Sequence, residues 1–464
     1  MPSPDQVLTA AQMRSAEQAL IDSGTSVDEL MQRAGRGAAE WVWRMAAGRS
    51  LTVLCGPGNN GGDGYVIAEW LRARGAPVTV VAAADPATVA AQTARNLFRG
   101  EILGPAAAVS GDVLVDCLFG TGLIRPLSDD LLALLTRLAA AHRQRIAVDL
   151  PSGVQSDSGA VLNPGLPVFD LTIALGAWKF AHFLMPAAAG MGLIRLVPLG
   201  IAEQADAVQV IARPQLSAPG AEAHKYTRGL LGVIGGSMPG AAILAGRAAQ
   251  HAGAGYVKLL GEGASLPADL VQDARPLAES LSDRRFNALL VGPGLGRDGA
   301  AREVLTLALA EQMPLVVDAD ALMLLAPRLL AEHRAPLIAT PHEGELKALE
   351  IAFGCAGGGN RAERALALAR ASGMIVVAKG ADSLVAAPDG RVAIAGRASS
   401  WLSTAGTGDV LAGTIASRLA TGADPFTAAC QGLWLHGEAA RLVGPAFTAS
   451  ELAGAIKAAY VACL

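Results

Sequence analysis

The sequence is poor in charged and aromatic side chains and has no long uninterrupted apolar segment. Charged residues make up 17% and aromatic residues 4% of the 464 residues, while 52% are hydrophobic. This composition can bury a large core, which excludes intrinsic disorder. The formal net charge of −4 gives no electrostatic reason to bind nucleic acid or an anionic membrane. We therefore expect small-molecule partners, no nucleic acid and no membrane.

Cysteines are also few, and the N-terminus lacks a targeting signal. The five cysteines are odd in number and widely separated, which argues against a disulfide framework and against zinc. The first residues, MPSPDQVLTAAQM, have no basic segment followed by an apolar one, unlike a signal peptide. No apolar segment reaches the roughly 18 residues of a membrane-spanning helix. These absences predict a cytoplasmic protein.

Glycine is abundant, and short apolar segments alternate with helical periodicity. The 54 glycines gather in clusters, as in tight loops near a ligand. This alternation of strands and helices predicts two different α/β domains with parallel sheets, residues 1–213 and 214–464. In the first we expect helices at 10–22 and 26–46 and strands at 51–55, 78–82, 113–119, 146–150 and 171–175. The second ends in helices expected at 408–421, 425–442 and 448–461.

A glycine loop, GPGNNGGDG at 56–64, follows the strand at 51–55 and leads into a helix expected to start near Tyr65. Glycine amides and a helix N-terminus can bind an anion such as a pyrophosphate. The spacing is neither a Walker A loop nor a GxGxxG fingerprint. A purely structural turn is the alternative interpretation.

Hard oxygen donors occur at further strand ends in this half. Asp116 precedes the loop GTGLIRP at 120–126, and IAVDLPSG contains Asp149 and Ser152. Because Asn60, Asp116 and Ser152 would end neighbouring strands, they could share a potassium or sodium ion. For each residue alone, an ordinary turn or cap is the simpler interpretation.

The segments QMRSAEQALIDSG, GPGNNGGDGYVIAEWL, VDCLFGTGL and DLPSG resemble the NAD(P)H-hydrate epimerase domain over about residues 8–210. The resemblance implies a Rossmann-like three-layer sandwich that interconverts the R and S epimers of the hydrated nicotinamide ring. It also implies K⁺ held by Asn60, Asp116 and Ser152, and Asp149 as the acid/base residue, although the residues alone do not decide between Asp149 and Asp63. The implied substrate residues are Asn59, Asn60, Gly61, Gly62, Asp63, Gly120, Thr121, Gly122, Leu123, Ile124, Arg125, Pro126 and Asp149.

The clearest chemistry of the second half lies in STAGTGDVLAG at 403–413. Small residues open a helix and place Asp409 in its first turn. Amides of residues 405–408 could hold a transferring phosphoryl group while Asp409 accepts a proton from a hydroxyl. An ordinary helix N-cap is the alternative.

Several other strand ends carry polar residues. Lys379, one of only six lysines, ends a strand in VVAKGADS, where it could bind a nucleotide. His342 lies in TPHEGE, and VVDADAL places Asp318 and Asp320 where one could contact Mg²⁺. A surface lysine and a loop histidine are the simpler interpretations.

Together with HKYTRGLLGVIGGS, GAAILAGRAAQHAGAGYVKL and GPGLG, these motifs resemble the ADP/ATP-dependent NAD(P)H-hydrate dehydratase domain from about residue 224 to the C-terminus. The resemblance implies a ribokinase-like fold with Mg²⁺. The chain departs from the family at Tyr226, Thr227 and Ser383, but Ser383 keeps the hydroxyl of the usual threonine. The implied nucleotide contacts are Lys379, Gly380, Ala381, Asp382, Ser383 and Gly408, and the implied substrate contacts are Ala241, Gly294, His342 and Asp409.

The two resemblances imply an enzyme that epimerises NADHX and NADPHX and dehydrates the S form at the expense of ADP or ATP. We also expect a homo-oligomer. We expect ADP, because the fused arrangement is typical of prokaryotic members. Two alternatives stay open. A ribokinase-like kinase of a small alcohol would make a stable phosphorylated product. A nucleotide sensor would bind without turnover, against which the presence of Asp149 and Asp409 argues.

Overall fold

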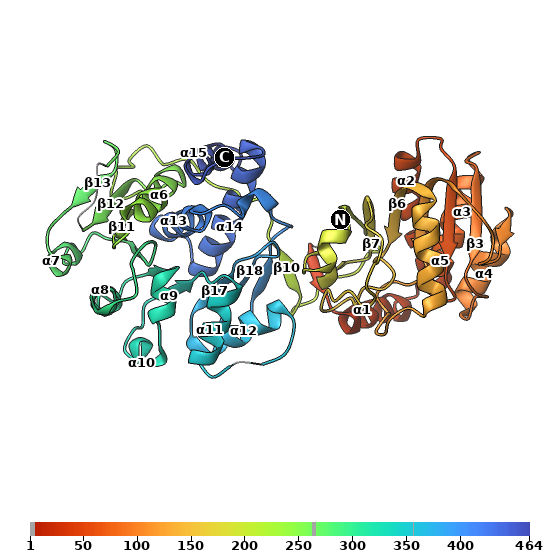
Figure 1. Ribbon diagram of the computed structural model, residues 1–464, viewed down its shortest axis with the longest axis horizontal. Helices are drawn as coiled ribbons and strands as arrows, with labels where there is room; N and C mark the ends of the chain where they lie inside the picture. Colours follow the sequence, from red (N-terminus) through yellow and green to blue (C-terminus); the bar gives the residue numbers. More distant parts are fainter. Residues whose placement is uncertain (1–4, 262–265, 356) are drawn as a thin grey trace. The chain divides into compact units, whose positions relative to one another are not determined.

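The computed structural model describes residues 5–261, 266–355 and 357–464. The chain divides into two units, Met1–Gln209 and Val210–Leu464, and each combines helices with a mainly parallel sheet (Figure 1). No helix in these described ranges is long and apolar enough to cross a membrane.

In the first unit, helices cover both faces of a parallel sheet of order β4-β3-β2-β5-β6-β7-β9. Successive residues of a strand face opposite sides of the sheet. In β2, Val53 therefore packs in an apolar cluster with residues of α1 to α4, whereas Leu54 packs in a second cluster with residues of α5. This is the predicted three-layer sandwich. The strands are β2 (Leu51–Cys55), β3 (Val78–Ala82), β4 (Ile102–Leu103), β5 (Gly111–Cys117), β6 (His142–Val148), β7 (Leu171–Leu175) and β9 (Leu193–Val197). The helices are α1 (Ala10–Asp22), α2 (Val27–Ala46), α3 (Asn59–Arg72), α4 (Val89–Leu97) and α5 (Asp129–Ala140).

Three further short strands pair with one another. β1 (Gln6–Leu8) pairs with β8 (Trp178–Lys179) in parallel and with β10 (Val208–Val210) antiparallel. Two short 3-10 helices, Phe180–His182 and Ala187–Gly190, follow β8.

The expected start of the third helix near Tyr65 was wrong, because α3 begins six residues earlier, at Asn59. Glycine is a poor helix former, but here it allows α3 to lie against the sheet. A Cβ on Gly61 would lie 1.9 Å from the carbonyl oxygen of Gly56, and one on Gly64 would lie 2.8 Å from Cys55 Sγ. Close packing therefore outweighs helix propensity in this loop.

Strands β5 and β6 also end two residues before their expected ends at 119 and 150. The Leu118 amide turns back to Asp116 Oδ1 at 3.1 Å, which ends the β5 ladder. Asp149 has a φ of +64°, which is incompatible with a strand. Both early ends lie where candidate site residues occur.

The second unit has a sheet of order β13-β12-β11-β14-β15-β16-β17-β18-β19, parallel as far as β17 and antiparallel beyond it. Its strands are β11 (Leu230–Ile234), β12 (Tyr256–Leu260), β13 (Val271–Asp273), β14 (Ala288–Val291), β15 (Leu315–Val317), β16 (Leu337–Ala339), β17 (Ile375–Ala378), β18 (Leu384–Ala386) and β19 (Val392–Ile394).

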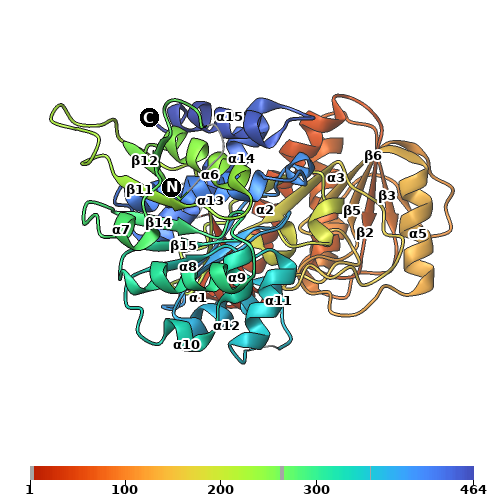
Figure 2. The same ribbon diagram turned by 60° about the vertical axis from the view of Figure 1, so that its left-hand side comes forward.

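One face of this sheet carries α6 (Pro239–His251), α13 (Thr407–Ala420), α14 (Pro425–Val443) and α15 (Ala449–Val461). One apolar cluster joins α6, α13 and α14 to the strands, and a second joins all four helices to one another. The remaining helices run between strands, with α8 on β14 and α12 on β17 (Figure 1 and Figure 2). They are α7 (Leu277–Leu281), α8 (Gly299–Ala310), α9 (Asp320–Leu324), α10 (Pro327–Leu330), α11 (Glu343–Ala352) and α12 (Arg361–Ser372); a 3-10 helix, Ser400–Leu402, precedes α13.

Candidate active sites

Three oxygen-bearing side chains lie at the carboxyl ends of neighbouring strands in the first unit. Asp116 is in β5, Ser152 follows β6, and Asn60 lies in the first turn of α3 after β2. β5 pairs with both β2 and β6. The Ser152 hydroxyl donates to Asp116 Oδ1 at 2.8 Å and its amide donates to Oδ2 at 2.9 Å. The structure thus joins Asp116 to Ser152.

Asp116 and Asn60 both have the character of ligands for a hard cation. Burial raises the pKa of Asp116 to about 6, although hydrogen bonds from Ser152 and Leu118 lower it. The side-chain oxygen and nitrogen of Asn60 are buried and have no hydrogen-bond partner among the described residues. Leaving a buried amide unsatisfied costs about 1–3 kcal/mol. A cation would satisfy the amide oxygen and stabilise the carboxylate together, so the donor set fits K⁺.

Asp149 is held as a carboxylate by two neighbours. Its Oδ1 accepts from the ammonium of Lys179 at 2.6 Å, and its Oδ2 accepts from the amide and hydroxyl of Thr121 at 2.7 and 2.6 Å. Burial raises the pKa of Asp149, but the Lys179 charge and these hydrogen bonds outweigh it and lower the pKa below its ordinary value. The backbone carbonyl of Asp149 also accepts from His182 Nε2 at 2.8 Å.

Two more carboxyl groups lie in the electrostatic field of this pair. Burial raises the pKa of Asp63, in α3, well above its ordinary value, and the charges of Asp149 and Glu17 raise it further. Burial also raises the pKa of Glu17, in α1, which Lys179 lowers. Asp63 therefore holds its proton to a higher pH than Asp149 does.

The predicted substrate loops lie at the same edge of the sheet. A Cβ on Gly120 would lie 2.5 Å from Asp149 Oδ2, so the 120–126 loop packs on that carboxylate, and its Ile124 is 80% exposed. Asn59 Oδ1 accepts from the Thr88 hydroxyl at 2.7 Å. Sequence reasoning missed Lys179 and Glu17, and the rarity of lysine was a signal for the first of these.

In the second unit, Asp409 lies in the first turn of α13. Gly406 precedes the helix with a φ of +89° and no side chain caps it. Burial raises the pKa of Asp409 to about 6, Asp318 and Asp320 raise it too, and Lys379 lowers it. One part of the expected anion hole is wrong, because the Thr407 amide donates to the Thr404 carbonyl at 3.3 Å.

Lys379 lies between Asp318 and the start of α13. Its ammonium donates to Asp318 Oδ1 at 2.5 Å, and the Thr340 hydroxyl donates to the same oxygen at 2.6 Å. A Cβ on Gly408 would lie 3.6 Å from Lys379 Nζ. The structure therefore brings together Lys379, Gly408 and the region of Asp409, which are far apart in the sequence.

His342 is the N-cap of α11 and lies beside the same strand end. Its Nδ1 accepts from the amides of Gly344 and Glu345 at 3.0 and 3.2 Å, while its side chain is 61% exposed. The amide of Lys379 donates to the Pro341 carbonyl at 2.8 Å. Capping orients the ring and leaves it open to a ligand.

Ala241 and Gly294 lie against each other at the start of α6. A Cβ on Gly294 would lie 3.1 Å from that of Ala241, and the Gly294 φ of +64° favours glycine. Asp320 holds the same glycine loop, since it accepts from the Gly296 amide at 3.0 Å and from Arg297 Nε at 2.7 Å. Asp318 and Asp320 thus have separate partners.

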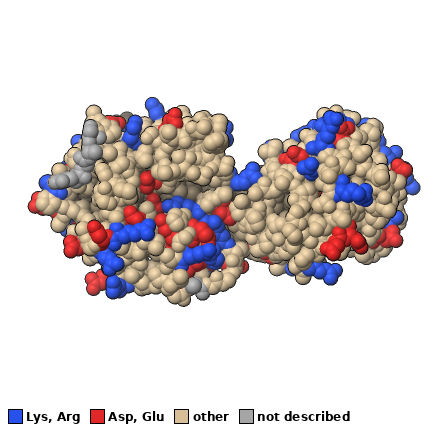
Figure 3. Space-filling model, viewed as in Figure 1, with Lys and Arg blue, Asp and Glu red and all other residues tan. Residues whose placement is uncertain are grey.

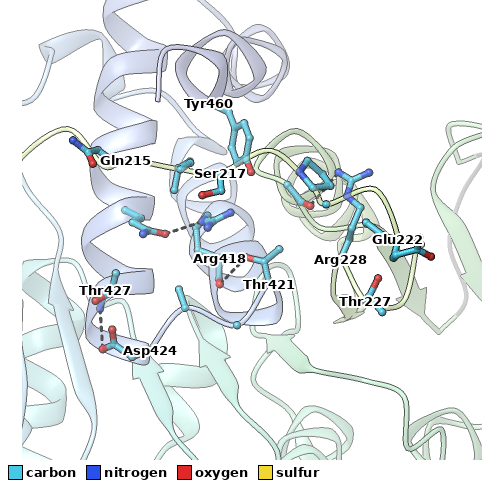
Figure 4. Close-up of a pocket in the computed structure, with 18 residues that line it drawn as sticks. Gln215, Ser217, Glu222, Thr227, Arg228, Arg418, Thr421, Asp424, Thr427 and Tyr460 are labelled. Carbon is cyan, nitrogen blue, oxygen red and sulfur yellow. Dashed lines mark hydrogen bonds between the residues drawn. The ribbon is translucent and has the colours of Figure 1, made fainter. Parts of the chain in front are cut away.

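One group of charged side chains of the second unit lies over α11 and α12 in the view of Figure 3, with others spread along its edges. A cavity of about 740 Å³ lies elsewhere, at the other end of α13 (Figure 4). Arg418 and Thr421 line it, and a rise of about 1.5 Å per residue along the helix places them about 14 and 18 Å from Asp409. This cavity is therefore not the site around Asp409.

Two family matches divide the chain. Residues 27–181 match the YjeF-related protein N-terminus, and residues 231–459 match NAD(P)H-hydrate dehydratase. The bifunctional NAD(P)H-hydrate repair enzyme Nnr of Moorella thermoacetica is 34% identical over 463 residues, covering 88% of this chain and 87% of the relative. The enzyme of the same name from Salinibacter ruber is 33% identical, covering 94% and 92%.

A solved structure is similar to part of this chain. The ADP/ATP-dependent NAD(P)H-hydrate dehydratase of Bacillus subtilis, co-crystallised with ATP and Mg²⁺, is 27% identical to this chain. The match covers 54% of this chain and 95% of that one, with a TM-score of 0.47.

Proposed function

Because this chain belongs to the family of bifunctional NAD(P)H-hydrate repair enzymes, we propose a division of its two reactions between its two units. The enzyme epimerises R and S NAD(P)HX, and it dehydrates the S epimer to NAD(P)H at the expense of ADP or ATP. We assign epimerisation to residues 1–213 and dehydration to residues 214–464, which the positions of the two family matches support.

For epimerisation, we propose that Asp149 is the base and Asp63 the protonated acid at the other end of the proton transfer. Lys179 and Thr121 lower the pKa of Asp149, which favours its carboxylate, whereas burial raises the pKa of Asp63, which favours its acid form. The loops Asn59–Asp63 and Gly120–Pro126 bind the hydrated nucleotide. Asn60, Asp116 and Ser152 hold K⁺, which when bound would supply positive charge beside the substrate.

For dehydration, Asp409 takes the proton of the ring hydroxyl, whose oxygen attacks the terminal phosphoryl of ADP or ATP and releases AMP or ADP. The carbon–oxygen bond then breaks, phosphate leaves, and loss of a ring proton re-forms the double bond. A pKa of about 6 leaves Asp409 ionised yet basic at neutral pH. The observation that best supports the dehydratase site is geometric: Lys379 lies beside Gly408 at the start of α13, whose first turn carries Asp409.

We assign the other candidate residues of the second unit to nucleotide and substrate binding at the Asp409 site. Lys379–Ser383 and Gly408 bind the nucleotide, and Ala241, Gly294 and His342 contact the hydrated ring or its nucleotide. Asp318 and Asp320 accept from Lys379, Thr340, Gly296 and Arg297, so we assign them no metal. We expect Mg²⁺ to arrive on the nucleotide phosphates. Cytoplasmic location, homo-oligomeric state and preference for ADP stay predictions.

Absorbance at 340 nm tests both activities in one experiment. The protein is mixed with R and S NADHX, Mg²⁺, K⁺ and either ADP or ATP. Full recovery of NADH with phosphate release is expected. Recovery of the S fraction alone, beyond slow spontaneous epimerisation, would exclude an active epimerase site. No recovery with either nucleotide would contradict the dehydratase.

A further inference from the structure

Arg361, the first residue of α12, binds two residues of the Lys379–Ser383 loop, Lys379 and Asp382. Its Nη1 donates to Asp382 Oδ1 at 2.9 Å, and its Nη2 donates to the backbone carbonyl of Lys379. The side chain is only 15% exposed. Two donors of one planar guanidinium therefore fix two points of the loop, a geometry that a lysine cannot reproduce.

The loop backbone is fitted to this guanidinium. A Cβ on Gly380 would lie 2.8 Å from Arg361 Nη1 and 2.8 Å from Asp382 Oδ1, so a side chain there would displace the ends of both side chains. Within the loop, the Gly380 amide donates to the Ser383 hydroxyl at 3.0 Å, and that hydroxyl donates to the Gly380 carbonyl at 2.7 Å. Arg361 supplies the external support of a tight turn.

Burying the Arg361 guanidinium costs desolvation free energy, which its hydrogen bonds must offset. Its Nε is buried and has no hydrogen-bond partner among the described residues. Glu343 is its second acidic neighbour, at 3.8 Å, beyond hydrogen-bond distance. The strong contacts of this side chain therefore go to the loop.

We propose that Arg361 is a positioning residue that shapes the Lys379–Ser383 loop for the nucleotide and so sets nucleotide affinity in the dehydratase reaction. The inference rests on the proposed function, in which this loop contacts ADP or ATP. Arg361 acts through Lys379 and Asp382 and does not itself carry out the chemistry at Asp409.

Arg364 offers a matched control on the same helix. It is 17% exposed and donates to Glu350 twice and to Glu343 once, each at 2.8 Å, without a hydrogen bond to the loop. Arg361→Ala and Arg364→Ala thus remove comparable buried ion pairs. Only the first removes contacts to the loop.

The experiment measures KM for ADP, KM for S-NADHX and kcat in the full chain, with the Kd for ADP from calorimetry. In Arg361→Ala we expect the KM and Kd for ADP to rise about tenfold or more, as expected for lost hydrogen bonds to charged groups. The KM for S-NADHX should change less than about twofold. Arg361→Lys, which restores the charge and one donor, should recover part of the affinity and serves if the alanine variant does not fold.

Lys379→Ala separates this inference from the proposed function. If Lys379→Ala leaves ADP affinity unchanged, the loop is not the nucleotide site and both ideas fail. A different outcome overturns only the role of Arg361. In that outcome Lys379→Ala weakens ADP binding, but both Arg361 variants keep the ADP affinity of the wild type or of the Arg364→Ala control.

Discussion

The ammonium of Lys179 lies 2.6 Å from Oδ1 of Asp149, with the lysine side chain only 1% exposed. Lys179 also donates to the Leu175 carbonyl at 2.6 Å, so two hydrogen bonds fix the position of its side-chain nitrogen. A base at Asp149 depends on this cation, because burial alone would favour the protonated acid.

Replacing Lys179 by Met should abolish most epimerase activity at neutral pH. Without the ammonium, burial of Asp149 is unopposed, its pKa rises and less of it is ionised. Removing one partner of a buried ion pair costs about 3–5 kcal/mol of stability. The epimerase rate should fall at least about a hundredfold. Measuring the rate at which R and S NADHX interconvert checks this.

The double variant Lys179→Met with Asp149→Asn controls for loss of folding. It leaves no unpaired buried charge, so its free energy of unfolding should exceed that of the single variant. Full epimerase activity in the folded single variant would contradict the role of the ion pair.

Asp63→Asn should separate catalysis from stability. The folded-state pKa of Asp63 is raised above the unfolded value, so the folded protein binds this proton more tightly. Its stabilising contribution is complete below the unfolded pKa of about 3.9 and is lost as pH rises through the folded pKa. The asparagine variant should therefore gain stability relative to wild type as pH rises, while epimerisation falls.

Urea unfolding across a pH series checks the stability, and the epimerase assay at the same pH values checks the catalysis. The control is Asp149→Asn, which should lose epimerisation without gaining stability at high pH. Equal pH dependence of unfolding in wild type and Asp63→Asn would show that Asp63 carries no raised pKa.

The apolar strands and amphipathic helices could be predicted because their periodicity is local. β2, β3 and β7 have the expected bounds, and α1 does as well. The hairpin β18–β19 was missed, although its Asp389–Gly390 pair is a typical turn signal. There the Ala387 amide donates to the Arg391 carbonyl at 2.9 Å.

The supporting residues of the sites could not be predicted, because their partners are distant in the sequence. Lys179 meets Asp149 across 30 positions, and Lys379 meets Asp318 across 61. A glycine-rich loop at a strand end indicates a site, since its composition is local. Which cation neutralises which carboxylate is decided by the packing of separate strands.

Gly413, in α13, should be intolerant of a side chain. A Cβ there would lie 2.0 Å from the Ala245 carbonyl oxygen of α6, so the two helices would have to separate. Overpacking of this kind costs about 1–3 kcal/mol, and Gly413→Ala should lower the free energy of unfolding despite better helix propensity. Gly437, in α14, has nothing within 4 Å of its Cβ position. Gly437→Ala should therefore stabilise the protein by up to about 1 kcal/mol.

Removing K⁺ should inactivate the epimerase and lower its stability. Replacing K⁺ by tetramethylammonium leaves the Asn60 amide and the buried Asp116 without their ligand. A cation that binds only the folded state stabilises it by about 2.7 kcal/mol at a concentration of 100 Kd. Thermal unfolding with and without K⁺ measures this independently of activity.

Asn60→Ala and Ser152→Ala should raise the K⁺ concentration that half-saturates this stabilisation. An unchanged K⁺ response in both variants would place the cation elsewhere. Epimerisation that is insensitive to K⁺ in the wild type would remove it from the reaction.

The dehydratase rate should follow the ionisation of Asp409. Its pKa is about 6, and only the carboxylate accepts the hydroxyl proton, so kcat should be constant above about pH 7 and fall about tenfold per pH unit well below 6. Asp409→Asn should lower kcat by about 10² to 10⁴ and leave the Kd for ADP within about threefold, because the amide keeps the size of the side chain. NADH formation at saturating S-NADHX and ADP gives the pH profile, and calorimetry gives the Kd. An acid limb that persists in the residual activity of Asp409→Asn would assign the titration to another group, and a variant with full turnover would remove Asp409 from the mechanism.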